Sequence, residues 1–254
     1  MSNRYRKKLA QQIARARQGG ASLNPLKEIF DEMMEDELKA TVTPPRGPKK
    51  LVEYTVQFKP MGDPWLGALP AEVAARLNEI GEDVVYRDKP WTAELEAMLA
   101  AYPDVPKIYN FLQISFGIEG LDADAERICE LCYARFPDYL FGATSYANLC
   151  LHRGRIEEAE KIFEGRRLIH EFLKGRMEMH VTEFVCFYVT LGMIQVEREK
   201  FGDAQCYLDI VKELAPDGRN VKALEARIRQ GLAPRVAERL TERFQAMHRQ
   251  VLAT

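Results

Sequence analysis

The chain repeats itself at an interval of 34 residues, and this repeat limits what it can fold into. The segment FGIEGLDADAERIC carries Gly120 and Ala125, and LHRGRIEEAEKIF carries Gly154 and Ala159 at the same relative positions. Sequence periods of about 20 to 50 residues are typical of stacked supersecondary units rather than of one globular core. The repeat therefore predicts a row of similar units over residues 90–218.

Apolar, small and proline residues recur at fixed offsets in three consecutive copies. They are Tyr109, Leu112, Phe116, Ala125, Cys129 and Pro137 in the first copy, Tyr146, Ala147, Cys150, Ala159 and Phe163 in the second, and Tyr188, Leu191, Gly192, Ala204, Leu208 and Pro216 in the third. This pattern resembles the tetratricopeptide repeat (TPR), which runs W-x2-L-G-x2-Y, then A-x3-F, then P. Gln113, Ala143, Glu171 and Gln195 depart from it. The resemblance covers about half of the chain.

The resemblance implies an all-α protein, an α-solenoid of about three TPR-like helix pairs, because each unit of that family is a helix-turn-helix. The units would span residues 106–138, 140–171 and 172–218, after a half-unit at 90–104 and before capping helices at 219–254. Small residues such as Ala147 and Gly192 would let the helices approach closely.

An insertion displaces the third copy. Ala159 and Ala204 stand 45 residues apart instead of 34, so 11 extra residues lie near 166–183. We expect this insertion to be helical. The run FVCFYVTLGMI, at 184–194, is apolar on every side, which is typical of a buried helix. Another segment of the chain is therefore expected to cover it: the helix near 24–38, the segment before the repeats, or the C-terminal helices. The alternative is that a partner protein covers it.

The N-terminal region is predicted to be small and mixed. Residues 1–43 read as a basic helix followed by an acidic one, with one apolar face each. These faces carry Tyr5, Leu9 and Ile13 in the first helix, and Leu26, Ile29, Phe30, Met33 and Leu38 in the second. Residues 44–89 begin with the proline-rich linker TPPRGPKK and form a mixed α/β segment.

One strand is expected in that mixed segment. In VEYTVQFK, Val52, Tyr54, Val56 and Phe58 alternate with polar residues, the period of a half-buried strand. A short helix at 71–80 follows, and DVVYR at 83–87 is the candidate partner for a two-stranded ribbon.

The C-terminal region, 219–254, reads as two capping helices. Gly231 is expected to end the first helix, and Pro234 to open the second. The second would carry Val236, Leu240, Phe244, Met247 and Val251 on one face. Such caps give a solenoid a polar outer side.

Charge is segregated along a chain whose net charge is only −2. Residues 1–20 contain six basic and no acidic side chains, and residues 219–254 contain eight basic and three acidic ones. Basic ends can attract nucleic acid or acidic membranes. Alternatively they are solvated helix faces, or they fold back on the acidic middle. The apolar run at 184–194 is too short to cross a bilayer and no signal-peptide core is seen, so we expect a cytoplasmic protein without membrane partners.

No motif of known chemistry stands out. The CELC pair, Cys129 and Cys132, falls at buried repeat positions and lacks a second cysteine pair, so core packing is favoured over a metal or redox site. Arg176, His180 and Glu183 are spaced to share one helical face, where they form either an anion or proton-transfer site or a surface ion-pair ladder. Phosphate loops, nucleophile elbows and metal-ligand motifs are missing, so we expect no enzyme activity, cofactor or metal.

The resemblance also implies a concave groove lined by the first helix of each unit, where this family binds peptides or partner proteins. Mapped onto this sequence, the groove residues are Lys107, Asn110, Phe141, Thr144, Asn148, Leu151, Val189 and Met193. The expected function is a non-catalytic protein-protein interaction module or scaffold. The alternative is a nucleic-acid-associated protein that uses its basic ends.

Overall fold

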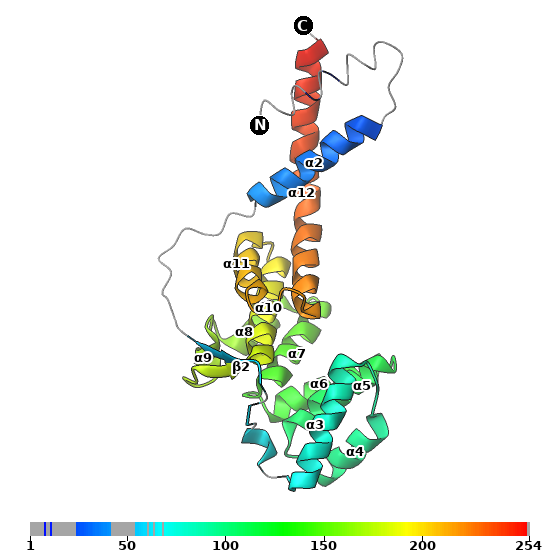
Figure 1. The fold of residues 1–254 in the computed structure, drawn as a ribbon, viewed down its shortest axis with the longest axis vertical. Helices are drawn as coiled ribbons and strands as arrows, with labels where there is room; N and C mark the ends of the chain where they lie inside the picture. The colour runs from blue at the N-terminus through cyan, green and yellow to red at the C-terminus, as the bar shows by residue number, and fades with distance from the viewer. Residues whose placement is uncertain are drawn as a thin grey trace.

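The structure is a computed structural model that describes residues 24–41, 54–59, 61–62, 64–67 and 69–252, together with Lys8 and Gln11. The described part is mostly helical, which confirms the all-α class (Figure 1). Helices stack into an elongated body, and one long helix extends away from it. The basic helix expected in residues 1–20 lies outside the described residues apart from Lys8 and Gln11.

Three helix pairs follow one another at the predicted positions. They are α5 (Pro106–Ile118) with α6 (Asp122–Arg135), α7 (Leu140–His152) with α8 (Ile156–Phe163), and α10 (Val181–Glu197) with α11 (Phe201–Lys212). The helices of each pair pack together, and each pair packs on the next through α6 with α7 and α8 with α10. The first helices of successive pairs are also in contact, α5 with α7 and α7 with α10.

The turn inside each pair uses the same left-handed backbone conformation. Gly120 and Gly154 have φ angles of +73° and +70°, and Glu199 occupies the equivalent position of the third pair with φ +58°. Glycine adopts this conformation without the steric cost that a Cβ atom brings. The repeated glycines are therefore explained by backbone geometry.

Substituting Gly154 tests this explanation. We expect Gly154→Ala to lower the free energy of unfolding by about 1 kcal/mol, because alanine is strained at positive φ. No atom lies within 4 Å of an added Cβ, so a clash cannot cause the loss. Urea unfolding followed by far-UV circular dichroism measures it. Gly154→Asn should lose less, since asparagine tolerates this conformation better, and an equal loss for both would contradict the explanation.

An arginine at the end of the first helix ties each later pair to the one before it. Arg153 forms ion pairs with Glu126 and with Glu130, the latter at 2.6 Å. Arg198, at the equivalent position of the next pair, contacts Glu160 at 2.6 Å as well as Glu157. Each exposed pair contributes little free energy. Their recurrence shows that equivalent positions of two successive pairs make the same kind of contact.

Two helices precede the first pair, where the sequence predicted half a unit. Helix α3 (Ala71–Tyr86) and helix α4 (Thr92–Ala101) both pack on α5. The strand expected at 83–87 is wrong, because α3 continues through it. Leu77, Ile80 and Val84 are all buried, and their spacing of three and four residues is the helical period.

The strand expected in VEYTVQFK is present in shorter form, but with another partner. Strand β1 (Thr55–Gln57) pairs in parallel with β2 (Glu178–His180), and Val56 lies opposite Met179. β2 belongs to the insertion, which also contains the short helix α9 (Ile169–Phe172) and several turns. The expectation that the insertion is helical throughout is therefore wrong.

The N-terminal segment continues from β1 to the 3-10 helix η1 (Pro64–Leu66). There, Trp65 packs edge-on against Phe136 and Tyr139, between the first two helix pairs. This segment therefore contacts the insertion at β1 and the first two pairs at η1.

A single helix, α12 (Arg219–Leu252), replaces the two expected C-terminal helices. Gly231 does not end it, and Pro234 lies inside it. An interior proline removes one backbone hydrogen bond and costs about 3 kcal/mol. Leu232 and Val236 on either side are buried, and their packing offsets this cost.

Helix α2 (Asn24–Thr41) crosses α12 beyond the body of the molecule (Figure 1). Met33 on its apolar face is buried, and Leu38 packs on the main core. Lys8, from the segment in which the basic helix is expected, forms an ion pair with Glu32 of α2 at 2.7 Å.

Candidate functional site

The expected groove residues lie on the first helices of the three pairs, and their exposure differs widely. Asn148 on α7 is exposed, and Asn110 on α5 is half-buried. Thr144 and Val189 are only 4% and 6% exposed. The remaining four are half-buried: Lys107, Phe141, Leu151 and Met193. The accessible part of the set therefore lies on α5 and α7. We define the α5–α7 face by Asn110, Asn148 and Leu151, together with Ile114, which is half-buried and lies about one helical turn after Asn110 on α5.

Burial on α10 agrees with the expectation that the chain covers this helix itself. Val189 is buried and Met193 packs on the main core. Two of the candidate segments contact α10. Leu224 of α12 lies against Gly192, and Tyr54, which directly precedes β1, packs on Phe184. The third candidate, α2, packs on α12. Val189 is therefore not accessible to a partner in this conformation.

Helix α3 lies beside α5, an arrangement that the sequence pattern did not predict. Asn78 on α3 accepts a hydrogen bond from Nζ of Lys107 at 3.0 Å, so α3 lies beside the first expected groove residue. A Cβ on Gly81 would stand 2.5 Å from the Phe111 ring, so the two helices approach closely there. In the sequence, Gly81 is the residue that could have indicated this contact, since small residues at matching helix positions mark close packing.

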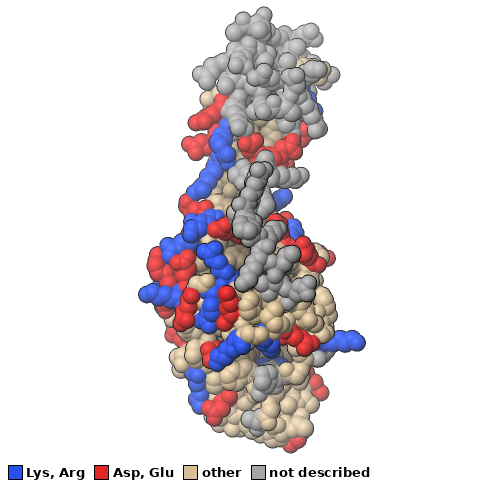
Figure 2. Space-filling model, turned by 90° about the vertical axis from the view of Figure 1, so that its left-hand side faces the viewer, with Lys and Arg blue, Asp and Glu red and all other residues tan. Residues whose placement is uncertain are grey.

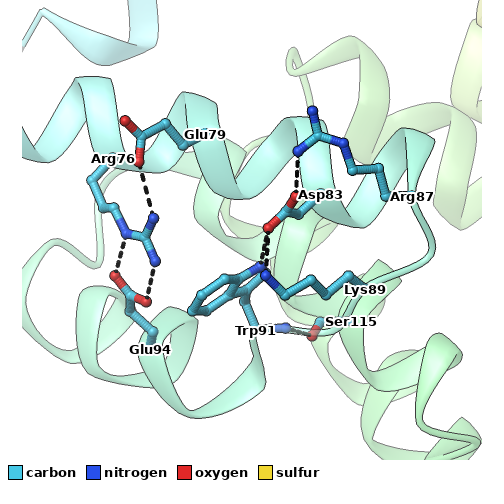
Figure 3. Close-up of polar contacts among 8 residues, drawn as sticks. All are labelled: Arg76, Glu79, Asp83, Arg87, Lys89, Trp91, Glu94 and Ser115. Carbon is cyan, nitrogen blue, oxygen red and sulfur yellow. Dashed lines mark hydrogen bonds and ion pairs between the residues drawn. The ribbon is translucent and has the colours of Figure 1, made fainter.

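A polar network fixes α3 to α4 and α5 (Figure 3). The Arg76 guanidinium donates to both oxygens of Glu94 at 2.8 and 2.9 Å, and also to Glu79. Ser115, buried on α5, accepts from the backbone N–H of Trp91 at 2.7 Å. Because these bonds join three helices, the network holds α3 in its position beside α5.

Asp83 and Trp91 form the second half of this network (Figure 3). Asp83 accepts from Arg87, from Lys89 and from the indole N–H of Trp91, and these hydrogen bonds lower the pKa of its carboxyl to about 2. The Trp91 ring lies between Arg76 and Lys89, at 4.6 and 4.2 Å from its centroid. All of the charged groups in this network have partners, which is typical of a structural junction.

Arg176, His180 and Glu183 do come together, but not on one helical face. Arg176 lies in a loop, His180 ends β2 and Glu183 is in the first turn of α10. Glu183 accepts from the backbone N–H of His180 at 2.9 Å and forms an ion pair with Arg176. His180 Nδ1 contacts the Thr182 hydroxyl at 2.7 Å and accepts from its backbone N–H. His180 and Glu183 therefore cap the start of α10 and Arg176 pairs with Glu183, so the expectation that the three residues share one helical face is wrong.

Basic residues of α12 pair with carboxylates elsewhere in the chain. Arg219 contacts Asp88 at 3.1 Å, and Arg229 contacts Glu35 at 3.3 Å. Lys222, Arg227 and Arg235 form ion pairs with Asp217, Glu197 and Glu199. Figure 2 shows positive and negative side chains interspersed over the described part of one face. This arrangement matches a basic segment that folds back on the acidic middle.

Three cysteines lie in the packed interior. Cys129, Cys132 and Cys150 are at most 2% exposed. Burial raises the pKa of both the Cys129 and the Cys132 thiols to about 12 and also raises that of Cys150. Within the described residues, no group of three metal-binding side chains is found. The CELC pair therefore packs in the core, as expected.

Thiol reactivity provides a direct measurement of this burial. We expect Cys129, Cys132 and Cys150 to react slowly with Ellman's reagent at pH 8, because the thiolate is the reactive form. Burial shields all three thiols and raises their pKa, to about 12 for Cys129 and Cys132. In urea all three should react fast. Mass spectrometry after brief native labelling assigns the sites, and complete labelling of these three would mean that the helix register is wrong.

In the part of the chain that the structure describes, no helix is both long enough and apolar enough to span a bilayer. Comparisons of the chain with protein-family models, with curated proteins and with solved structures give no match. The function is therefore inferred from the residues and contacts of this chain alone.

Proposed function

We propose that this protein is a non-catalytic interaction module of TPR-like helix pairs arranged as a solenoid, and that it binds an extended polypeptide on the α5–α7 face. The observation that carries the proposal is the succession of three helix pairs in repeat register, joined by equivalent arginine contacts and by contacts between their first helices. Solenoids of this kind bind partners through extended surfaces.

The α5–α7 face combines two amides with two aliphatic side chains. Asn110 and Asn148 can each donate to and accept from a peptide backbone, which is what an extended segment without secondary structure requires. Ile114 and Leu151 are half-buried and pack at the edges of the two cores, so they offer apolar surface beside the amides. The ligand class is therefore an extended peptide with apolar side chains. The proposed binding surface does not include α10, because Val189 on that helix is already buried.

Site-directed photocrosslinking tests the proposal. A photoreactive residue at Asn148 is expected to capture a partner, whereas the same residue at Ile210, exposed on α11, should not. The double variant Asn110→Ala/Asn148→Ala should weaken binding of the captured partner about tenfold, because each lost hydrogen bond is worth about 0.5 to 1.5 kcal/mol. An unchanged melting temperature would exclude unfolding as the cause.

The proposal would be wrong if the photoreactive residue captured partners equally well at Asn148 and at Ile210. It would also be wrong if the double variant bound the partner with wild-type affinity. We do not extend it to nucleic acid, because the described cations of α12 named above already have carboxylate partners.

A further inference from the structure

The insertion builds a site that holds an extended segment. Strand β1, which comes from a distant part of the chain, pairs with β2 and contacts α10. His170 of α9 contacts Tyr54, which directly precedes β1. We call this arrangement the strand site and define it by Ile169, His170, Met177–His180 and Phe184. It shares no residue with the α5–α7 face, so the inference drawn from it does not rest on the proposed function.

The apolar residues beneath β1 are buried while β1 lies on them, whereas β1 itself stays partly exposed. Ile169 and Met179 are fully buried, and Phe184 is 5% exposed. In contrast, Tyr54 and Val56 are only half-buried and Thr55 is exposed. The site therefore presents an ordered apolar floor, whereas the segment that lies on it remains open to solvent on its outer side.

The contacts of β1 define the chemistry that the strand site recognises. The backbone N–H of Thr55 donates to the Met177 carbonyl at 3.0 Å. The Tyr54 hydroxyl is 3.0 Å from Nδ1 of His170, and its ring meets Phe184 edge-on at 5.9 Å. Val56 lies opposite Met179 in the parallel register. The site thus selects an aromatic residue with a hydroxyl followed two positions later by a branched apolar residue.

The strength of this pairing is limited. A two-stranded ribbon is marginally stable by itself, and β1 contributes only three residues to it. Its advantage over a separate peptide is covalent attachment, which for short linkers gives an effective concentration in the millimolar range. Occupancy by β1 therefore reflects tethering as much as affinity, and another segment with the same pattern can compete for the floor.

We propose that the strand site is a peptide-binding site that accepts, parallel to β2, an extended segment of a partner protein with tyrosine followed two residues later by a β-branched residue. In this structure β1 occupies it as the internal competitor. Recognition by strand addition combines main-chain hydrogen bonds with contacts of alternate side chains. Here Thr55 supplies a main-chain bond to Met177, and the side chains of Tyr54 and Val56 pack against the core.

The test uses the full chain with its internal competitor weakened. In the variant Tyr54→Ala/Val56→Asp, β1 loses both side chains that contact the floor. A fluorescein-labelled peptide of residues 51–60, LVEYTVQFKP, is titrated into this variant and into the wild type, and binding is followed by fluorescence anisotropy. We expect at least tenfold tighter binding to the variant, and no binding of a peptide that carries the same two substitutions.

Matched controls locate the binding. Phe58→Ala, which alters an exposed residue next to β1, should leave binding at the wild-type level. Adding His170→Ala to the double variant should weaken binding, because it removes the partner of the tyrosine hydroxyl. If circular dichroism shows that the double variant is unfolded, Tyr54→Ala alone is used with the same expectation and a smaller increase in affinity.

Three results would overturn the proposal. One is no binding of the peptide to a folded variant, and the second is equal binding to variant and wild type. The third is a wild-type dimer in light scattering that Val56→Asp abolishes, which would mean that the site exchanges β1 between two copies of this chain instead of receiving a partner.

Discussion

Replacing Phe187 by alanine is expected to lower the free energy of unfolding by about 3 to 5 kcal/mol, the range for a fully buried phenylalanine. Phe187 is not exposed at all and lies against three other rings. Phe163 of α8 meets it at 5.6 Å between centroids, Phe172 of α9 at 6.2 Å and Tyr188 of α10 at 5.1 Å. Removing the ring opens a cavity where the second pair, the insertion and the third pair meet.

Urea unfolding monitored by far-UV circular dichroism measures this loss. Phe58→Ala is the matched control, because Phe58 is 63% exposed and its removal leaves no cavity. We expect that control to change the free energy of unfolding by less than about 0.5 kcal/mol, as surface substitutions do. A loss below about 1 kcal/mol for Phe187→Ala would mean that the neighbouring rings collapse into the space, or that the insertion does not pack here.

The sequence was informative about Phe187 because its burial follows from local pattern. The run 184–194 is apolar around the whole helix, and such a helix must be covered. The helix pairs were predictable for the same reason, since glycine turns, small residues and helical spacing are local signals that recur every 34 residues. The half-buried strand around Val56 was also visible, through its alternation.

Partners distant in sequence were not predictable. Strand β1 pairs with β2 across more than 120 residues, since Gln57 bonds Glu178. The period-two pattern of a strand does not indicate which other segment forms hydrogen bonds with it. The nearest apolar segment, 83–87, is therefore a wrong prediction of the partner strand. Likewise, Pro234 gave a strong local signal for a helix boundary, and only the burial of Leu232 and Val236 overrides it.

In the candidate site, too, the position of a residue on its helix was predictable, whereas its exposure to solvent was not. Asn148 and Thr144 occupy similar places on one helix in the repeat pattern, yet one is exposed and the other is 4% exposed. Whether such a residue faces solvent depends on neighbouring helices and on segments outside the repeats. The α5–α7 face could be defined only once the positions of α3 and α12 were known.

The close approach of α12 to α10 depends on Gly192, and we expect Gly192→Val to lower the free energy of unfolding by about 3 kcal/mol, near the upper end for overpacking. A Cβ at this position would stand 2.6 Å from Cδ2 of Leu224 and 3.1 Å from its Cδ1. Leu224 is itself fully buried, so its side chain has little room to move. The helices must therefore separate or repack.

Gly117→Ala is the control that separates this clash from the loss of a glycine as such. Gly117 is also helical, but no atom lies within 4 Å of an added Cβ. Alanine there should be neutral or stabilising by up to about 1 kcal/mol, because glycine is the poorer helix former. Chemical denaturation of both variants gives the comparison. If Gly192→Val lowers the free energy of unfolding and Gly117→Ala raises it, α12 is held against α10 by a contact that only glycine permits. A Gly192→Val variant as stable as the wild type would instead mean that α12 can shift away at no cost, and the covering of α10 by α12 would then not depend on close packing.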